Sequence, residues 1–286
     1  MSDFLSYLIN GLAVGCGFAL IGSGLVAIHR VTRVVNFAQA MFAVVAGLSA
    51  ASFLSAGLPH GAAEIAAVLV AAAAGLVVGV LAIGRPGTSP LSALIVTLGI
   101  GIFAYAVEIV VWGDQPRSFA GLRGSFTVAG VTVQKQYLLI VAVTALTFTA
   151  LALFFGRTYA GKGLTACASN PYAARVVGID VRRMGLLAFG LGGALGGIAG
   201  VLVTPLQPIS FDSDVTLIVN GFAAAIFGGL QRPGAALAGG LVLGVAEAMI
   251  AGYGLGSYQI EVALGLMLAL MIWQAARTPA LHEETA

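Results

Sequence analysis

The feature that most constrains the fold of this chain is a succession of apolar runs long enough to cross a bilayer. A membrane-spanning helix needs about 20 apolar residues to cross roughly 30 Å of hydrocarbon. Only 8% of the 286 residues are charged, against about a quarter in a soluble domain. The chain is therefore predicted to be an all-α polytopic membrane protein with a single transmembrane domain, 1–286. The expected spans are 4–28, 36–56, 62–84, 91–112, 137–156, 184–204, 233–251 and 257–274.

A ninth apolar segment, 214–228, is shorter than the others. It follows Asp212 and Asp214 and ends at Gly228-Gly229. Such a segment either crosses the bilayer as a short or broken helix or re-enters from one side. The sequence thus predicts about eight or nine transmembrane helices.

Basic residues orient these helices, because lysine and arginine concentrate on the cytoplasmic side of a membrane. With the N-terminus outside and nine crossings, ten basic residues lie inside and three lie outside. If 214–228 does not cross, eight basic residues lie inside and five lie outside. Both topologies place the loop 157–183 in the cytoplasm and the loop 113–136 outside. Within the outer loop, the alternating run 126–133 predicts a short hairpin, which is either a connector or a cover over the outer mouth.

Several classes of function are excluded. The chain shows no cluster of catalytic side chains, and no spacing of histidine or cysteine predicts a metal site. The run from Gly156 to Gly163 matches GxxxxGK, but Gly163 stands where a phosphate-binding loop needs a hydroxyl for magnesium. A net charge of +2 does not indicate binding to nucleic acid. We expect no enzymatic activity, no metal and no cofactor.

A few polar side chains interrupt the apolar segments. Glu247 lies in the middle of 233–251, where a charged group is expensive and is expected to face the bundle interior or a cavity. It either lines a pathway or forms a hydrogen bond between helices. The same two alternatives apply to the uncharged side chains of Asn36, Gln39, Gln207 and Asn220.

Two further patterns concern helix packing. The run 190–200 is rich in glycine, which predicts either tight packing or helices that shift against one another. A weak internal echo relates 35–42 to 219–227. Polar-interrupted segments at matching positions of two halves are typical of transporters built from inverted repeats, so we expect a possible inverted repeat.

The cytoplasmic loop 157–183 carries five of the thirteen lysine and arginine residues. Asn170 suits a helix N-cap, Pro171 the first helical position and Gly178 the C-terminal cap. These residues predict a helix over 171–177, and a second short helix is expected over 163–168. Helices this short are marginal alone in water. They pack either on the membrane face of the protein itself or in a groove of another subunit.

In order and spacing, several motifs resemble the permease subunits of branched-chain amino acid ABC importers, the LivH-like group. The motifs are VTRVVNFA at 31–38, ASNPYAA at 168–174 followed by Gly178-Ile179, the glycine-rich run after Arg183, AAAIFGGL at 223–230, and Gly239-Gly240 with Glu247. The resemblance implies a pore-forming subunit without its own ATPase in the inner membrane of a bacterium. Its implied partners are two cytoplasmic ABC ATPase subunits, a second permease subunit and an extracytoplasmic solute-binding protein.

The resemblance also implies that the loop 163–178 couples the permease to the ATPase. The residues expected to carry this coupling are Gly163, Ala166, Asn170, Pro171, Tyr172, Ala173, Arg175, Val176 and Gly178. The chain departs from the family at Gln39-Ala40, where relatives have His-Gly, and at Thr165, where they have arginine. The expected solute is a branched-chain or hydrophobic amino acid, or a related small solute such as urea, an amide or an aromatic acid. The alternative is a self-sufficient channel or ion-coupled transporter.

Overall fold

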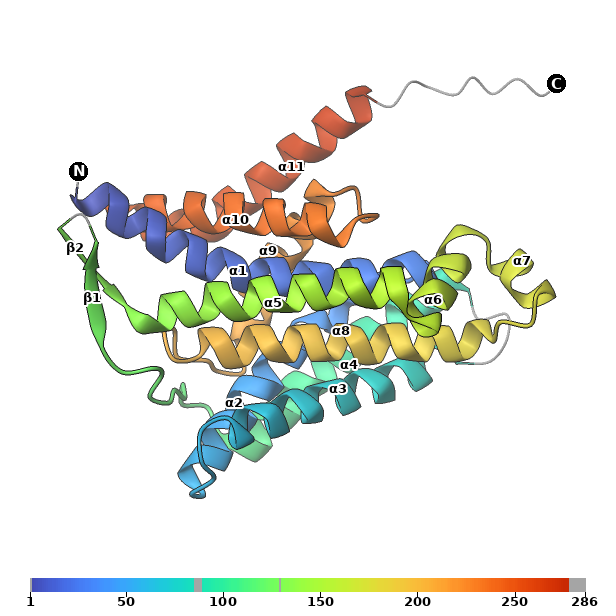
Figure 1. The fold of residues 1–286 in the computed structure, drawn as a ribbon, viewed down its shortest axis with the longest axis horizontal. Coiled ribbons are helices and arrows are strands. Elements are labelled where there is room, and N and C mark those ends of the chain that lie inside the picture. The colour runs from blue at the N-terminus through green and yellow to red at the C-terminus, as the bar shows by residue number, and fades with distance from the viewer. Residues whose placement is uncertain (1, 85–88, 129, 278–286) are drawn as a thin grey trace.

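A computed structural model describes residues 2–84, 89–128 and 130–277, which form an elongated helical bundle with one short hairpin (Figure 1). Seven helical segments in this described part are long and apolar enough to cross a membrane. The prediction of an all-α polytopic membrane protein is confirmed. The main helices include these segments and also α9 and α11, which are not among the seven. They are α1 (Ser2–Thr32), α2 (Met41–Ser55), α3 (Ala62–Ile83), α4 (Pro90–Trp112), α5 (Lys135–Arg157), α8 (Val181–Val203), α9 (Ser213–Phe227), α10 (Pro233–Ile250) and α11 (Gln259–Arg277).

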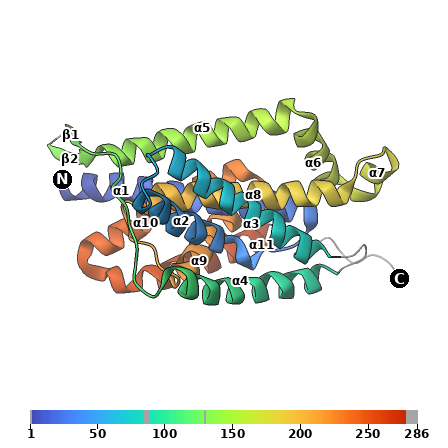
Figure 2. The ribbon, with the colours of Figure 1, turned by 90° about the horizontal axis from the view of Figure 1, so that it is seen from below.

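Most of the shorter elements lie at the two ends of the bundle (Figures 1 and 2), whereas the short helix η1 lies inside it. The N-terminus and the hairpin lie at one end, called here the hairpin end. Two short helices, α6 and α7, lie at the opposite end, called here the α7 end. The short elements are η1 (Phe37–Gln39), β1 (Ser125–Val128), β2 (Val131–Gln134), α6 (Tyr159–Ser169), α7 (Pro171–Val176), η2 (Ala251–Leu255) and η3 (Gly256–Tyr258).

Glycine lets the central helices approach closely. A Cβ atom on Gly15 of α1 would lie 2.6 Å from the carbonyl oxygen of Gly240 on α10. Likewise, a Cβ on Gly193 of α8 would collide with the backbone of Ala71 on α3. In a bilayer the hydrophobic effect contributes little to the association of helices. The close contact between helix backbones therefore stabilises their association through van der Waals packing. The glycine-rich runs therefore hold helix pairs together in this structure.

The segment 36–56, expected as one span, is long and apolar enough to cross a membrane over Phe37–Ser55, and it begins with the short η1 before α2. Residues 33–40 fold back into the bundle after α1, and α2 begins only at Met41. The Asn36 side chain caps the short η1 by accepting a hydrogen bond from the Ala38 amide at 3.1 Å. Phe42 at the start of α2 contacts Gly196, well inside α8. The helix α2 thus starts within the bundle, because glycines on its neighbours leave room for the re-entrant chain.

The helix α9 is a second partial helix. Its 15 residues span about 22 Å, less than the hydrocarbon thickness. Residues 204–212 fold back from the end of α8, and Gly221 in α9 packs on Ile21 and Gly22 of α1. The expectation of a short or broken segment at 214–228 agrees with this geometry.

The two partial helices belong to an inverted repeat. The order α1, re-entrant loop, α2, α3, α4 recurs as α8, re-entrant loop, α9, α10, α11, with α1 and α8 running in opposite directions (Figure 1). The contacts between helices show the same symmetry. The contact of α1 with α10 corresponds to the contact of α8 with α3. The contact of α2 with α8 corresponds to the contact of α9 with α1. The echo between 35–42 and 219–227 is not the structural equivalence: Asn36 precedes α2, whereas Asn220 lies within α9.

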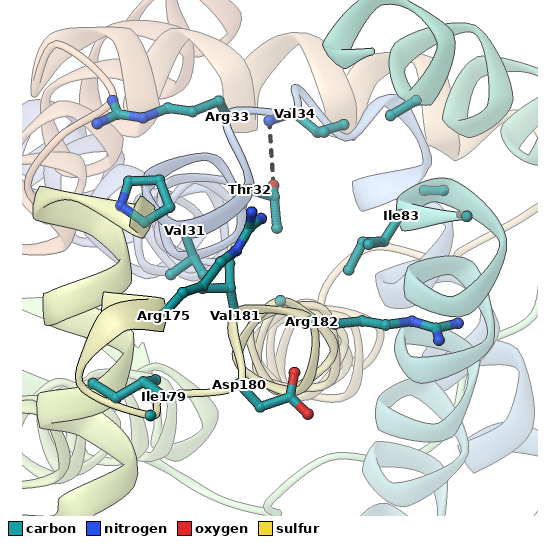
Figure 3. A pocket seen from close by; sticks show the side chains of 16 residues that line it. Val31, Thr32, Arg33, Val34, Ile83, Arg175, Ile179, Asp180, Val181 and Arg182 are labelled. Carbon is teal, nitrogen blue, oxygen red and sulfur yellow. Dashed lines mark hydrogen bonds between the residues drawn. The ribbon is translucent and has the colours of Figure 1, made fainter. Parts of the chain in front are cut away.

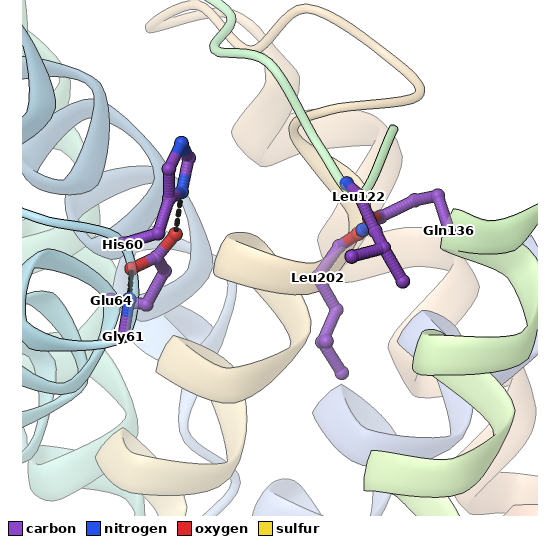
Figure 4. Close-up of polar contacts among 6 residues, drawn as sticks. All are labelled: His60, Gly61, Glu64, Leu122, Gln136 and Leu202. Carbon is purple, nitrogen blue, oxygen red and sulfur yellow. Dashed lines mark hydrogen bonds and ion pairs between the residues drawn. The ribbon is translucent and has the colours of Figure 1, made fainter. Parts of the chain in front are cut away.

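The predicted hairpin is confirmed, because β1 and β2 pair antiparallel with Phe126 opposite Val133. Gln136 links the loop that precedes the hairpin to α8. The Gln136 Nε2 donates to the Leu202 carbonyl at 3.0 Å, and the Leu122 amide donates to Gln136 Oε1 at 2.9 Å (Figure 4). At the same end, Glu64 caps α3 and contacts the His60 ring at 2.7 Å. The loops of the hairpin end are thus held against the bundle.

Candidate translocation path and coupling surface

The helix α6 is anchored at the α7 end. The Thr158 hydroxyl accepts from the Gly161 amide at 2.9 Å, so the helix begins earlier than the expected 163–168. The second short helix expected over 163–168 is thus confirmed, and its start lies earlier because the Thr158 cap is outside the interval considered. Leu164 and Cys167 are buried in a cluster with residues near the end of α1 and the start of α8, both at the α7 end. Burial raises the pKa of the Cys167 thiol, so Cys167 acts as an apolar packing residue.

The helix α7 confirms the predicted caps. The Asn170 Oδ1 accepts from the amides of Tyr172 and Ala173, each at 3.0 Å. Pro171 occupies the first turn, and Gly178 adopts a φ of +85°, which favours glycine. The local sequence therefore sets both ends of this six-residue helix.

The two faces of α7 differ in exposure. Ala174 is 3% exposed and packs on the protein, whereas Tyr172 and Val176 are 76% and 71% exposed. Val177 continues the exposed surface. We call Tyr172, Val176 and Val177 the α7 ridge. Since the helix packs through Ala174, the α7 ridge remains available to another subunit.

The other candidate coupling residues lie around this helix. Gly163 is buried, and its position meets the Met184 sulfur of α8. Ala166 is half-buried, and Ala173 and Arg175 are exposed. Thr165, the departure from the family, is exposed and its hydroxyl bonds the Gly161 carbonyl at 2.9 Å. The structure thus brings the predicted coupling residues onto one end of the bundle.

Among the candidate path residues, Asn36 and Gln39 are fully buried and bonded to each other at 3.3 Å. The Gln39 Nε2 also donates to the Gly192 carbonyl of α8 at 2.9 Å, and its amide fills the space beside Gly24 of α1. This geometry corresponds to the alternative in which both side chains bond neighbouring protein groups.

Asn220 and Glu247 lie beside each other where α9 packs on α10. Asn220 is 0% exposed and Glu247 is 6% exposed. Both polar atoms of Asn220 and one carboxyl oxygen of Glu247 lack a well-formed hydrogen bond within the described chain. The two polar side chains therefore share a buried site between α9 and α10.

Gln207 is placed differently from the other candidates. It is exposed and lines a recess of about 210 Å³ between α1, α2, α8 and α9. Ala43 of α2 and Ser213 of α9, both in first turns of the partial helices, line the same recess. The recess is otherwise mostly apolar, and Thr216 adds a second hydroxyl. Its size and lining suit a small solute with an apolar side chain.

A pair of acids, one buried and one half-buried, was missed from the sequence. Glu108, one turn before the end of α4, is only 1% exposed, and both its carboxyl oxygens are buried without a hydrogen bond to a described residue. Its carboxylate lies near Asp214 at the start of α9. Since Asp214 belongs to the other half of the repeat, no local pattern indicated that the two acids lie close together. No cluster of three possible metal ligands occurs among the described residues.

The comparisons with known proteins agree with these features. The family model described as branched-chain amino acid transport system / permease component matches residues 7–274. The permease protein BraD of Pseudomonas aeruginosa, from a high-affinity branched-chain amino acid transport system, is 27% identical over 95% of this chain and 94% of BraD. The LivH permease protein of Salmonella typhimurium is 28% identical over 94% of this chain and 93% of LivH.

A solved structure shares the fold. The complex PsaBC from Streptococcus pneumoniae with Fab aligns with a TM-score of 0.52 at 14% identity. The alignment covers 93% of this chain and 91% of that chain. This likeness concerns the fold alone.

Proposed function

The chain belongs to the family of permease components of branched-chain amino acid transport systems, and from this premise we propose that it forms part of the solute path of an ATP-driven importer. The proposed solute is a branched-chain or other hydrophobic amino acid, or a related small solute such as urea, an amide or an aromatic acid. The protein is a transport subunit rather than an enzyme. ATP hydrolysis is assigned to separate subunits.

The observation that carries this proposal is the α7 ridge. A helix of six residues is capped at both ends and packs through Ala174, yet Tyr172 and Val176 are left exposed. Exposed apolar side chains on a rigid short helix suit insertion into a groove of a partner. We propose that two cytoplasmic ABC ATPase subunits supply this groove. The α7 end then faces the cytoplasm, and the N-terminus lies outside.

The proposed path begins at the opposite end. The recess beside Gln207 lies where two partial helices start, and polar-interrupted helices of this kind mark solute sites in transporters. A solute-binding protein would deliver the solute there, and a second permease subunit would complete the path. Closure of the ATPases would act on α6 and α7 and, through Met184 and Gly163, on the glycine-rich α8.

Purification of the expressed system tests the proposal. Wild-type permease should co-purify with an ATPase, and uptake of radiolabelled leucine should stop when the catalytic glutamate of that ATPase is replaced. Absence of co-purification together with unchanged uptake would remove the ATP-driven assignment. Competition by isoleucine, urea and an aromatic acid then ranks the solutes.

One observation favours a second candidate, an ion-coupled transporter. Glu108, Asp214 and Glu247 place three acids within the bundle, and ionisable groups inside a membrane often serve proton relays. Liposomes that contain this chain alone separate the two candidates. Solute flux without ATP that depends on a pH gradient supports ion coupling, whereas flux only in the presence of ATPase and ATP supports the importer.

A further inference from the structure

A pocket of about 590 Å³ opens at the α7 end, away from the recess beside Gln207. The ends of four long helices line it: Thr32 from α1, Ile83 from α3, Ala93 from α4 and Gly185 from α8. Arg175 of α7 and the residues that follow this helix close a further side (Figure 3). Because α3, a 22-residue helix, is about 33 Å long, its end lies at the level of the lipid headgroups when the helix spans the bilayer.

The pocket carries unpaired positive charge. Arg175 extends from α7 toward Thr32, and Arg182 extends to the other side of the pocket, past Ile83 toward α3 (Figure 3). Neither guanidinium forms an ion pair within the described chain. The nearby acid, Asp180, is already bonded to Arg183 at 3.1 Å. The pocket therefore presents two free guanidinium groups to a ligand.

Thr32 and Arg33 also line the pocket, and Arg33 donates to the Ala168 carbonyl at 2.9 Å; the rest of the lining is apolar or glycine. Val34, Ile83 and Val181 form walls of the pocket. Outside it, the ends of α3 and α4 expose Leu81 and Leu91, at 54% and 67%. A cationic pocket that continues into an apolar helix surface matches an amphiphile with an anionic head better than it matches a free anion.

We propose that this pocket binds the phosphate-bearing headgroup of an anionic phospholipid. Arg175 and Arg182 contact the phosphate, since guanidinium groups form paired hydrogen bonds with phosphate oxygens. The acyl chains lie along the exposed ends of α3 and α4. Basic pockets between transmembrane helices are suited to such headgroups. The bound lipid bridges α7 and α8, so it stabilises the position of the α7 ridge.

The full chain, with any subunits that co-purify, can be tested by native mass spectrometry. Dioleoyl phosphatidylglycerol and dioleoyl phosphatidylcholine have the same acyl chains and differ in head charge. We expect retention of phosphatidylglycerol at least tenfold above phosphatidylcholine. In the double variant R175Q/R182Q, the retention of phosphatidylglycerol should fall about tenfold, because each basic residue near a lipid surface contributes to the binding of anionic lipid. The matched control R123Q/R157Q removes two exposed arginines outside the pocket and should retain the lipid.

Competition separates lipid from free anion. Inorganic phosphate and glycerol 3-phosphate at millimolar concentration should displace less than half of the phosphatidylglycerol. Equal retention of both lipids, displacement by phosphate, or full retention by R175Q/R182Q would each overturn the proposal. If the double variant does not fold, R175Q and R182Q are measured singly, each with an expected loss of about threefold. Solute uptake enters none of these measurements, so they are independent of the transport assignment.

Discussion

The Gln39 side chain reaches the Gly192 backbone, with 2.9 Å between the Gln39 Nε2 and the Gly192 carbonyl oxygen. This bond ties the first re-entrant segment to α8, the first helix of the second half. Gln39 also lies against Gly24 of α1. One amide therefore joins both halves of the inverted repeat in the centre of the bundle.

Replacement of Gln39 by leucine should destabilise the protein by about 1–3 kcal/mol, because Asn36 and the Gly192 carbonyl would lose their partner without access to water. The measurement is thermal unfolding in detergent. The exposed Gln115→Leu is the control and should leave the unfolding temperature unchanged. Equal stability of Gln39→Leu and wild type would show that the bond is not needed.

Gly200→Ala should destabilise the packing of α8 on α2, since a Cβ at this position collides with the backbone carbonyl of Ala43. Overpacking of this kind costs about 1–3 kcal/mol. Gly99→Ala on α4 is the matched control, because its Cβ would meet nothing within 4 Å. The unfolding temperature should therefore fall for Gly200→Ala, whereas that of Gly99→Ala should stay unchanged or rise. A larger loss for Gly99→Ala would contradict the packing described.

Asn170→Ala should weaken the start of α7 by about 1 kcal/mol, because the Tyr172 and Ala173 amides lose their cap. Hydrogen exchange of these two amides should accelerate about fivefold. Asn170→Asp keeps the acceptor and should exchange as wild type does. Ser169→Ala, whose hydroxyl bonds only the Thr165 carbonyl of α6, is the neighbouring control. Unchanged exchange in Asn170→Ala would show that packing alone holds the helix.

Tyr172→Asp and Val176→Asp should each abolish coupled uptake while membrane insertion is retained, because a charge on the α7 ridge opposes an apolar groove. Co-purification with the ATPase should fall at least tenfold. Leu122→Asp, an exposed position at the hairpin end, should co-purify normally. Wild-type uptake in the two α7 variants would mean that the loop is only a connector.

Glu247→Gln should leave leucine uptake within about twofold of wild type and the unfolding temperature unchanged, since the amide keeps the size and polarity of the carboxyl group beside Asn220. Glu247→Leu removes the polar group beside the buried Asn220 amide and should cost about 1–3 kcal/mol. Thermal unfolding and leucine uptake are measured together. Loss of uptake in Glu247→Gln with unchanged stability would instead identify the carboxylate as part of the path.

The sequence by itself determined the features that depend on local or compositional physics. Apolar runs near 20 residues have no stable alternative to a membrane helix, because unpaired backbone groups are expensive in lipid. The ends of α7 follow from Asn170, Pro171 and Gly178, since caps act within four residues. The hairpin at 126–133 likewise follows from its alternation.

Only the tertiary structure decided which distant segments of the chain contact one another. Residues 33–40 include the polar side chains of Asn36 and Gln39, yet they pack inside the bundle because Gly24 and Gly192 leave room for Gln39. Glu108 lies near the end of α4 and becomes buried only in the folded bundle, where its carboxylate lies near Asp214 of α9. These outcomes depend on contacts between the two halves of the repeat, and no local pattern encodes which helix covers which.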